Sequence, residues 1–196
     1  MTTILRLESS IKGEAAVSRK LTDRIIARLT AAHPDATVIT RDLSKGLSHI
    51  NGAWLGAVYT PADARDSDQQ TIAATADALL DEVKAADTLV IALPVYNFGI
   101  PAHLKAWIDN IARKGESFTY TENGPIGLLT GKRAFVAYTA AGTPMGSDLD
   151  HASGYLRHML GFLGITDVTF VAADGLAMDR EAGMARAQQA LEQIAA

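Results

Sequence analysis

Apolar residues follow two patterns along the chain, short uninterrupted runs and a helical spacing. The uncharged run at 88–93 predicts a strand buried on both faces. Between the runs, apolar residues recur at helical intervals, as Leu104, Trp107, Ile108 and Ile111 do. Strands are predicted at residues 4–7, 36–40, 88–93, 134–139 and 167–171. Helices are predicted at about 18–33, 71–86, 101–111, 149–163 and 178–195.

Three residues mark where predicted helices begin or end. Ser18 stands where an N-cap belongs, because its hydroxyl can accept a hydrogen bond from the first turn. His33 is followed by a proline, so that first helix must stop there. Pro101 is expected in the first turn of the third helix, where its missing N–H does no harm.

Strands and helices alternate along the whole chain. This order predicts an α/β fold with three layers, α/β/α, in which a five-stranded parallel sheet has the order 2-1-3-4-5. We expect a single domain over residues 1–196. Residues 43–70 show no clear period and are expected to form a long loop. Residues 116–132 are expected to form an extended excursion with an Asn-Gly turn.

The amino-acid composition excludes several kinds of site and makes some classes of protein less fitting. The chain has no cysteine, which excludes disulfides, thiolate nucleophiles and cysteine-bound metals. The 18 basic and 22 acidic residues give a net charge of −4, whereas a nucleic-acid binder is more often basic and a strongly acidic electron carrier more negative. No signal peptide or run of about 20 apolar residues is present, so we expect a cytoplasmic protein without a membrane partner.

The residues that could bind a ligand lie in three loops. Ligands of such sheets bind at the carboxyl ends of the strands, near the switch point of the strand order. The loops that leave the first, third and fourth strands there are residues 8–18, 94–101 and 139–147. Because these three strands are neighbours in the predicted order, we expect the three loops to converge on one site.

Each loop suits a different part of a flat, phosphate-bearing ligand. The first offers serines and a helix start, which bind phosphate well, although Ser18 as a plain N-cap is the alternative. The second places Tyr96 and Phe98 around Asn97, a combination that suits a heteroaromatic ring, although core packing of the aromatics is the alternative. The third has small residues that let the backbone approach a ligand, although an ordinary turn would also use them.

Several segments carry a resemblance to a known family. The sequence resembles the FMN-dependent NAD(P)H:quinone oxidoreductases and azoreductases of bacteria, which have a flavodoxin-like fold, along nearly the whole chain. The most specific segments are 94–101 (PVYNFGIP), 104–109 (LKAWID), 118–125 (FTYTENGP), 127–132 (GLLTGK) and 161–167 (GFLGITD).

The resemblance implies FMN as cofactor and NADH or NADPH as electron donor. It maps the cofactor-binding residues onto Ser10, Ala16, Val17, Ser18, Val95, Tyr96, Asn97, Phe98, Thr139, Ala140, Ala141 and Gly142. Two of them depart from the family. Ala16 replaces a serine that contacts the phosphate, and Ala140 replaces an arginine beside the ring.

The resemblance also implies the reaction and the assembly. It implies ping-pong, two-electron reduction of quinones and reductive cleavage of aromatic azo compounds to amines, with no catalytic side chain and no metal. Tyr120 and Phe162 are candidates for the substrate pocket, from the same or the partner subunit, with plain packing as the alternative. The helix at 149–163 is apolar nearly all round, which favours burial in a homodimer.

Two other functions stay open at this point. A flavodoxin-type carrier would pass single electrons to a protein partner, and a flavin-free binding module could use the same fold. The mild charge and the two long excursions favour an enzyme with a substrate pocket.

Overall fold

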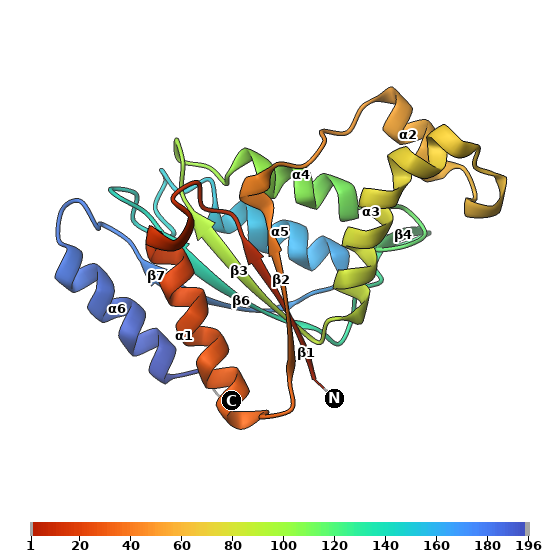
Figure 1. The fold of residues 1–196 in the computed structure, drawn as a ribbon. Coiled ribbons are helices and arrows are strands. Elements are labelled where there is room, and N and C mark those ends of the chain that lie inside the picture. Colours follow the sequence, from red (N-terminus) through yellow and green to blue (C-terminus); the bar gives the residue numbers. More distant parts are fainter. Residues whose placement is uncertain (1, 195–196) are drawn as a thin grey trace.

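A five-stranded parallel sheet forms the centre of the computed structural model, which describes residues 2–194 (Figure 1). The strands follow the order β2-β1-β3-β6-β7, which is the predicted order 2-1-3-4-5 for the main sheet and confirms the fold class. Their bounds are β1 Thr3–Glu8, β2 Thr37–Asp42, β3 Thr88–Pro94, β6 Arg133–Thr139 and β7 Asp167–Ala173.

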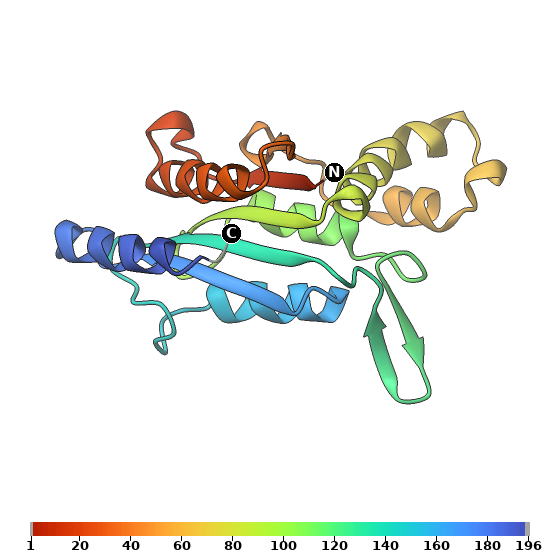
Figure 2. The same cartoon turned by 90° about the horizontal axis from the view of Figure 1, so that it is seen from below.

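Helices cover both faces of this sheet (Figures 1 and 2). Alternate strand residues point to opposite faces, so Ile4 and Val90 meet one helical layer, whereas Leu5 and Leu89 meet the other. The first layer consists of α1 (Val17–Ala32) and α6 (Arg180–Glu192). The second consists of α3 (Ser67–Ala85), α4 (Ala102–Ile111) and α5 (Ser153–Leu163).

The segment 43–70 is not the long loop that the sequence predicts. It contains the helix α2 (Gly52–Tyr59), and α3 already begins at Ser67. Trp54, Ala57 and Val58 recur at i, i+3 and i+4 and pack on α3 in a small cluster of their own. The Asn51 side chain caps α2 by accepting a hydrogen bond from the Trp54 amide. Eight residues with two glycines give too short a pattern for the periodicity to stand out.

The predicted excursion at 116–132 forms a β-hairpin and has the predicted Asn-Gly turn. β4 (Phe118–Thr121) pairs antiparallel with β5 (Gly124–Gly127), and the turn uses Asn123-Gly124. Gly124 has a φ of 106°, which a residue with a side chain rarely adopts. The hairpin projects from the body of the protein at the end opposite to the carboxyl ends of the strands (Figure 2).

Some helix boundaries differ from those predicted. α1 begins at Val17 with Ala16 at the N-cap, so Ser18 is not the cap. Pro101 is itself the N-cap residue of α4, one position before the first turn. α5 begins at Ser153 rather than at 149, because the Asp150 carboxylate accepts hydrogen bonds from the Ala152 and Ser153 amides and fixes the start there.

The last helix is shorter than predicted, since α6 ends at Glu192; the predicted end at 195 lies outside the described residues. Within residues 2–194, none of the helices combines the length and the apolar character that a membrane crossing requires.

Candidate functional site

The three predicted loops meet at the carboxyl ends of β1, β3 and β6. The Tyr96 hydroxyl lies 3.2 Å from the Ser10 hydroxyl and accepts a hydrogen bond of 3.2 Å from the Ile11 amide, which joins the second loop to the first. The Val95 amide donates to the Thr139 carbonyl at 2.8 Å, which joins the second loop to the third. The topology therefore assembles one site from three segments that are distant in sequence.

A cavity of about 490 Å³ opens between these loops, a size that suits a small-molecule ligand. Eight of the predicted cofactor residues line it: Ser10, Ala16, Val17, Val95, Tyr96, Thr139, Ala140 and Ala141. Most of this lining is small or apolar, and its polar groups are backbone atoms, a few hydroxyls and the side chains of Lys12 and Arg180.

The start of α1 faces this cavity without a cap of its own. Ala16 has no side chain that could accept a hydrogen bond, and the first turn has no acidic residue. The first amide of α1 with a backbone acceptor is that of Lys20, bonded to the Ala16 carbonyl at 3.2 Å. The amides of residues 17–19 therefore remain available to an anion.

Ser18 adds an unsatisfied hydroxyl to the same turn. Its side chain is buried, yet its Oγ has no hydrogen-bond partner among the residues that the structure describes. An unpaired buried hydroxyl costs about 1–3 kcal/mol, so a ligand that forms a hydrogen bond with Ser18 would recover this cost. Together with the free amides, Ser18 fits the phosphate group that the sequence predicts here.

Hydrogen bonds between Thr22 and a buried ion pair of β1, Arg6 and Glu8, tie this strand to α1. Glu8 is buried and accepts a hydrogen bond from the Thr22 hydroxyl at 2.6 Å and another from the Arg6 guanidinium at 2.5 Å. Arg6 also donates to Thr22. Because Thr22 lies one turn after Ser18, this network fixes the position of the first turns of α1 relative to the sheet.

The second loop is a tight turn with unusual backbone angles. Asn97 and Phe98 have φ values of 48° and 67°, and paired hydrogen bonds of 3.0 Å join Tyr96 to Gly99 across the turn. Asparagine tolerates this left-handed region, but phenylalanine does so at a cost of about 1–2 kcal/mol. Strain of this kind is common at functional sites. The turn also presents the Phe98 ring to solvent, 51% exposed.

A second cavity, of about 650 Å³, lies beside this turn. Tyr96 and Asn97 line it, as do His103 and Tyr155 from the neighbouring helices α4 and α5. The His103 ring nitrogen Nε2 lies 2.6 Å from the Ser9 carbonyl, which makes it the donor and anchors α4 to the first loop. The turn therefore separates two adjacent cavities.

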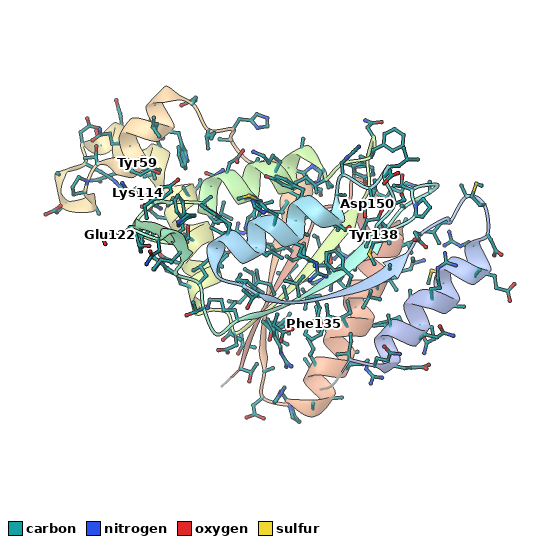
Figure 3. All side chains as sticks on the ribbon, turned by 180° about the vertical axis from the view of Figure 1, so that it is seen from behind. Tyr59, Lys114, Glu122, Phe135, Tyr138 and Asp150 are labelled. Atoms are coloured by element: carbon teal, nitrogen blue, oxygen red, sulfur yellow. The ribbon has the colours of Figure 1, made fainter. Side chains whose placement is uncertain are left out.

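Asp150 holds the third loop in place. Its carboxylate accepts hydrogen bonds from the Gly146 amide and from the Ser153 hydroxyl, besides the two amides at the start of α5. Burial alone would raise the pKa of Asp150, but these hydrogen bonds outweigh burial and lower it. Nearby, burial and the Asp150 charge raise the pKa of the Tyr138 hydroxyl, so this group stays protonated (Figure 3).

Comparisons with known proteins identify the family. A sequence model of a family described as having a flavodoxin-like fold matches residues 2–196. The chain is 66% identical to an FMN-dependent NADH:quinone oxidoreductase of Cereibacter sphaeroides over 196 residues, which cover 100% of both chains. The chain belongs to this flavodoxin-like family, together with the FMN-dependent NADH:quinone oxidoreductases. It is also 45% identical over 199 residues to the FMN-dependent NADH:quinone oxidoreductase of Azotobacter vinelandii, covering 100% of both.

A solved structure agrees with this assignment. The FMN-dependent NADH-azoreductase of Bacillus anthracis, determined in complex with FMN, is 28% identical and has a TM-score of 0.86. The match covers 98% of this chain and 97% of that one. The predicted family is therefore confirmed, and the predicted cofactor and enzyme class agree with the names of these relatives.

Four predicted cofactor residues do not line the first cavity. Ser18 is buried on α1, next in sequence to the lining residue Val17, whereas Asn97 lines the second cavity. Phe98 and Gly142 are exposed. Phe98 is nevertheless fixed in place, since its carbonyl accepts a hydrogen bond of 3.1 Å from the His151 amide.

The two aromatic residues predicted for the substrate pocket, Tyr120 and Phe162, lie away from the three loops of their own chain. Tyr120 belongs to the hairpin and Phe162 to the end of α5, and both contact Phe118, at ring-centre distances of 5.7 and 4.6 Å. Phe162 is nine residues beyond the start of α5, about 14 Å along the helix from the third loop. One chain does not bring these aromatics to its own three loops.

Sequence reasoning missed the residues that close the first cavity from the side of α6. Leu176, Ala177 and Arg180 line it, as does Lys12 from the first loop. The Leu176 and Ala177 amides bond to the Ala140 and Ala141 carbonyls at 3.1 and 2.9 Å. The loop after the fifth strand also leaves a carboxyl end of the sheet, and this signal could have identified it.

Proposed function

We propose that the chain is an FMN-dependent oxidoreductase that transfers two electrons from NADH or NADPH to quinones and cleaves aromatic azo compounds to amines. The observation that carries this proposal is the phosphate cradle: the three free amides of residues 17–19 and the buried, unpaired Ser18 hydroxyl, in the turn of α1 whose Val17 lines the three-loop cavity. When bound, FMN supplies the two-electron redox chemistry, and the protein supplies binding, orientation and electrostatics.

Each loop has a role in this proposal. Ser10, Ser18 and the amides that follow Ala16 hold the phosphate group. The backbone of residues 95–98 and 139–142 contacts the ring system. The amides of Val95, Tyr96 and Ala140 already donate to protein carbonyls, so those of residues 97, 98, 141 and 142 are the donors that would favour negative charge on the ring. The strained turn at Asn97 and Phe98 keeps these donors fixed before the ligand arrives.

The proposed reaction is ping-pong. NAD(P)H binds first and leaves as NAD(P)⁺, and the acceptor then occupies the same place. A quinone takes two electrons in one cycle, whereas an azo bond needs two cycles to give two amines. The second cavity, beside Asn97, offers room for these substrates next to the ring loop.

A homodimer completes the pocket in this proposal. On α5, Leu156, Leu160 and Leu163 face the core, whereas Tyr155, Met159 and Phe162 are only half-buried and form an adjacent apolar stripe. A second copy that packs on this stripe would cover it and could bring Tyr120 and Phe162 to the partner's loops. The cytoplasmic location expected from the sequence stays a prediction.

A spectroscopic titration tests the function. The purified chain should show flavin bands that NADH bleaches and a quinone restores, without any partner protein. A colourless protein that does not bind added FMN would contradict the proposed function. Bleaching that requires a separate reductase would favour the single-electron carrier instead.

One variant tests the site itself. Asn97→Ala removes an amide beside the second cavity and places alanine in a left-handed turn, so flavin affinity or turnover should fall several-fold. Asn51→Ala, which removes an asparagine cap at α2, is a control of the same size far from the loops. Equal flavin affinity and turnover in the Asn97 variant and the wild type would contradict the role of Asn97.

A further inference from the structure

Two cations line the first cavity without a protein partner. Lys12 comes from the first loop, and Arg180 is the first residue of α6. Within residues 2–194, neither side chain takes part in an ion pair or a hydrogen bond, and the cavity lining contains no acidic residue. By contrast, Arg65 and Arg113 both pair with Asp77, and Arg186 pairs with Asp174.

The fold places these cations on two sides of the phosphate cradle. α1 and α6 are neighbours on one face of the sheet, and both begin at its carboxyl edge (Figure 1). Arg180 lines the same cavity as Ala16 and Val17 at the start of α1. Lys12 precedes that turn, and its amide donates to the Ser10 hydroxyl at 3.3 Å. The hydrogen bonds from Leu176 and Ala177 to the third loop fix the segment that leads to Arg180.

The cradle needs such charges. A phosphate monoester carries a charge of about −1.5 to −2 at pH 7, whereas a helix N-terminus offers an equivalent of about +0.5. Ala16 at the N-cap contributes no hydroxyl. Uncompensated negative charge would therefore remain unless side chains supply the balance.

We propose that Lys12 and Arg180 bind the phosphate group of the bound flavin from opposite sides. The proposal rests on the proposed function and adds to it the residues that select a phosphorylated flavin over one without phosphate. The Arg180 guanidinium can donate two parallel hydrogen bonds to phosphate oxygens, whereas Lys12 acts as a point charge.

Flavin binding to the full chain, freed of its flavin, tests this proposal. FMN and riboflavin differ by the phosphate group alone. We expect Arg180→Ala to raise the dissociation constant of FMN about ten-fold and Lys12→Ala several-fold, with the riboflavin constant unchanged in both. Added salt should weaken FMN binding to the wild type more than to either variant. Arg180→Lys should recover part of the loss.

Lys20→Ala is the matched control. Lys20 is an exposed cation on α1 outside the cavity, so this variant makes the same change in net charge. Thermal unfolding of each variant checks that folding is retained. If Arg180→Ala and Lys20→Ala weaken FMN equally, the effect is one of general charge and the proposal is wrong.

Two further outcomes would overturn it. The 2′-phosphate of NADPH has the same chemistry, so a KM for NADPH that rises while the FMN constant stays unchanged would assign Arg180 to the donor instead. Unchanged FMN affinity in the double variant would exclude both cations. Failure of the wild-type chain to bind FMN or riboflavin would refute the proposed function itself, a different result from any of these.

Discussion

The two ends of the central sheet differ in backbone strain. Both ends use a glycine at a close backbone contact, Gly127 near Gly164 and Gly183 near Asp174, but within residues 2–194 only the loop end has residues other than glycine with a positive φ. At the loop end, the chain turns through Asn97 and Phe98, two residues with side chains held in the left-handed region. At the hairpin end, glycines meet: a Cβ built on Gly127 would lie 2.0 Å from the Gly164 nitrogen. Tyr59, Lys114 and Glu122 gather at this second end, and Tyr138 and Asp150 lie at the first (Figure 3).

This difference indicates what each end is for. A glycine contact packs two segments with no conformational strain, which suits a structural role. A phenylalanine in the left-handed region is tolerated only where the surroundings enforce it, and its exposed ring gains nothing from burial. We therefore propose that the strain at the loop end serves ligand binding and that the glycine contact at the hairpin end serves stability.

The largest effect is expected from Gly127→Ala at the hairpin end. The new methyl group would meet backbone atoms of Leu163 and Gly164, which cannot rotate away as a side chain can. We expect a loss of about 3 kcal/mol in the free energy of unfolding, the upper end of the usual cost of overpacking. Denaturant unfolding measures this loss, and FMN affinity of the folded variant should stay within about two-fold of the wild type, because the cavity lies at the other end of the sheet.

Gly161→Ala on α5 is the control for that change. A Cβ at Gly161 meets no atom within 4 Å, so alanine should stabilise the helix by about 0.5–1 kcal/mol. Equal stability of the two variants would show that the hairpin does not depend on close contact with α5.

The loop end gives the next largest effect, through Phe98→Gly and Phe98→Ala. Both variants lose the ring, but only glycine removes the left-handed strain, which costs about 1–2 kcal/mol. Glycine also gains entropy in the unfolded chain, which offsets part of this benefit. We therefore expect its unfolding midpoint to exceed that of the alanine variant by only about 2–4 °C. Turnover should fall in both. Identical midpoints would mean that the turn is not strained.

How far the sequence predicts each end follows from the same contrast. The convergence of the three loops could be predicted from the sequence, because a parallel sheet brings the loops after neighbouring strands together whatever their sequences are. The left-handed backbone angles of Phe98 and the position of Arg180 in the cavity lining could not be predicted, since both depend on tertiary contacts. At the hairpin end, the Asn123-Gly124 turn could be predicted from the sequence. The positions of Tyr120 and Phe162 could not, because no local pattern indicates the direction in which a hairpin projects.

A smaller effect is expected from Tyr96→Phe. The variant keeps the ring but loses the hydroxyl that joins the second loop to Ser10 and Ile11. A hydrogen bond of this kind contributes about 0.5–1.5 kcal/mol, so the FMN dissociation constant should rise about three- to ten-fold. Tyr59→Phe is the matched control, since the Tyr59 hydroxyl makes no hydrogen bond within residues 2–194 and stands at the hairpin end. An effect of equal size in the control would show that the loops do not depend on this link.

The smallest effect is a pH dependence at the third loop. The pKa of Asp150 is lowered in the folded protein, so its carboxylate adds stability above its unfolded pKa of about 3.9, and this stability is lost as the pH falls through the folded pKa. Asp150→Asn removes the charge at every pH. The difference in unfolding midpoint between wild type and variant should therefore be largest near pH 6 and shrink below about pH 4. Asp35→Asn, at an exposed site between α1 and β2, should show no such trend. A difference that stays constant from pH 6 to pH 3 would mean that the charge of Asp150 does not hold the loop, and that its hydrogen bonds act as those of a neutral group would.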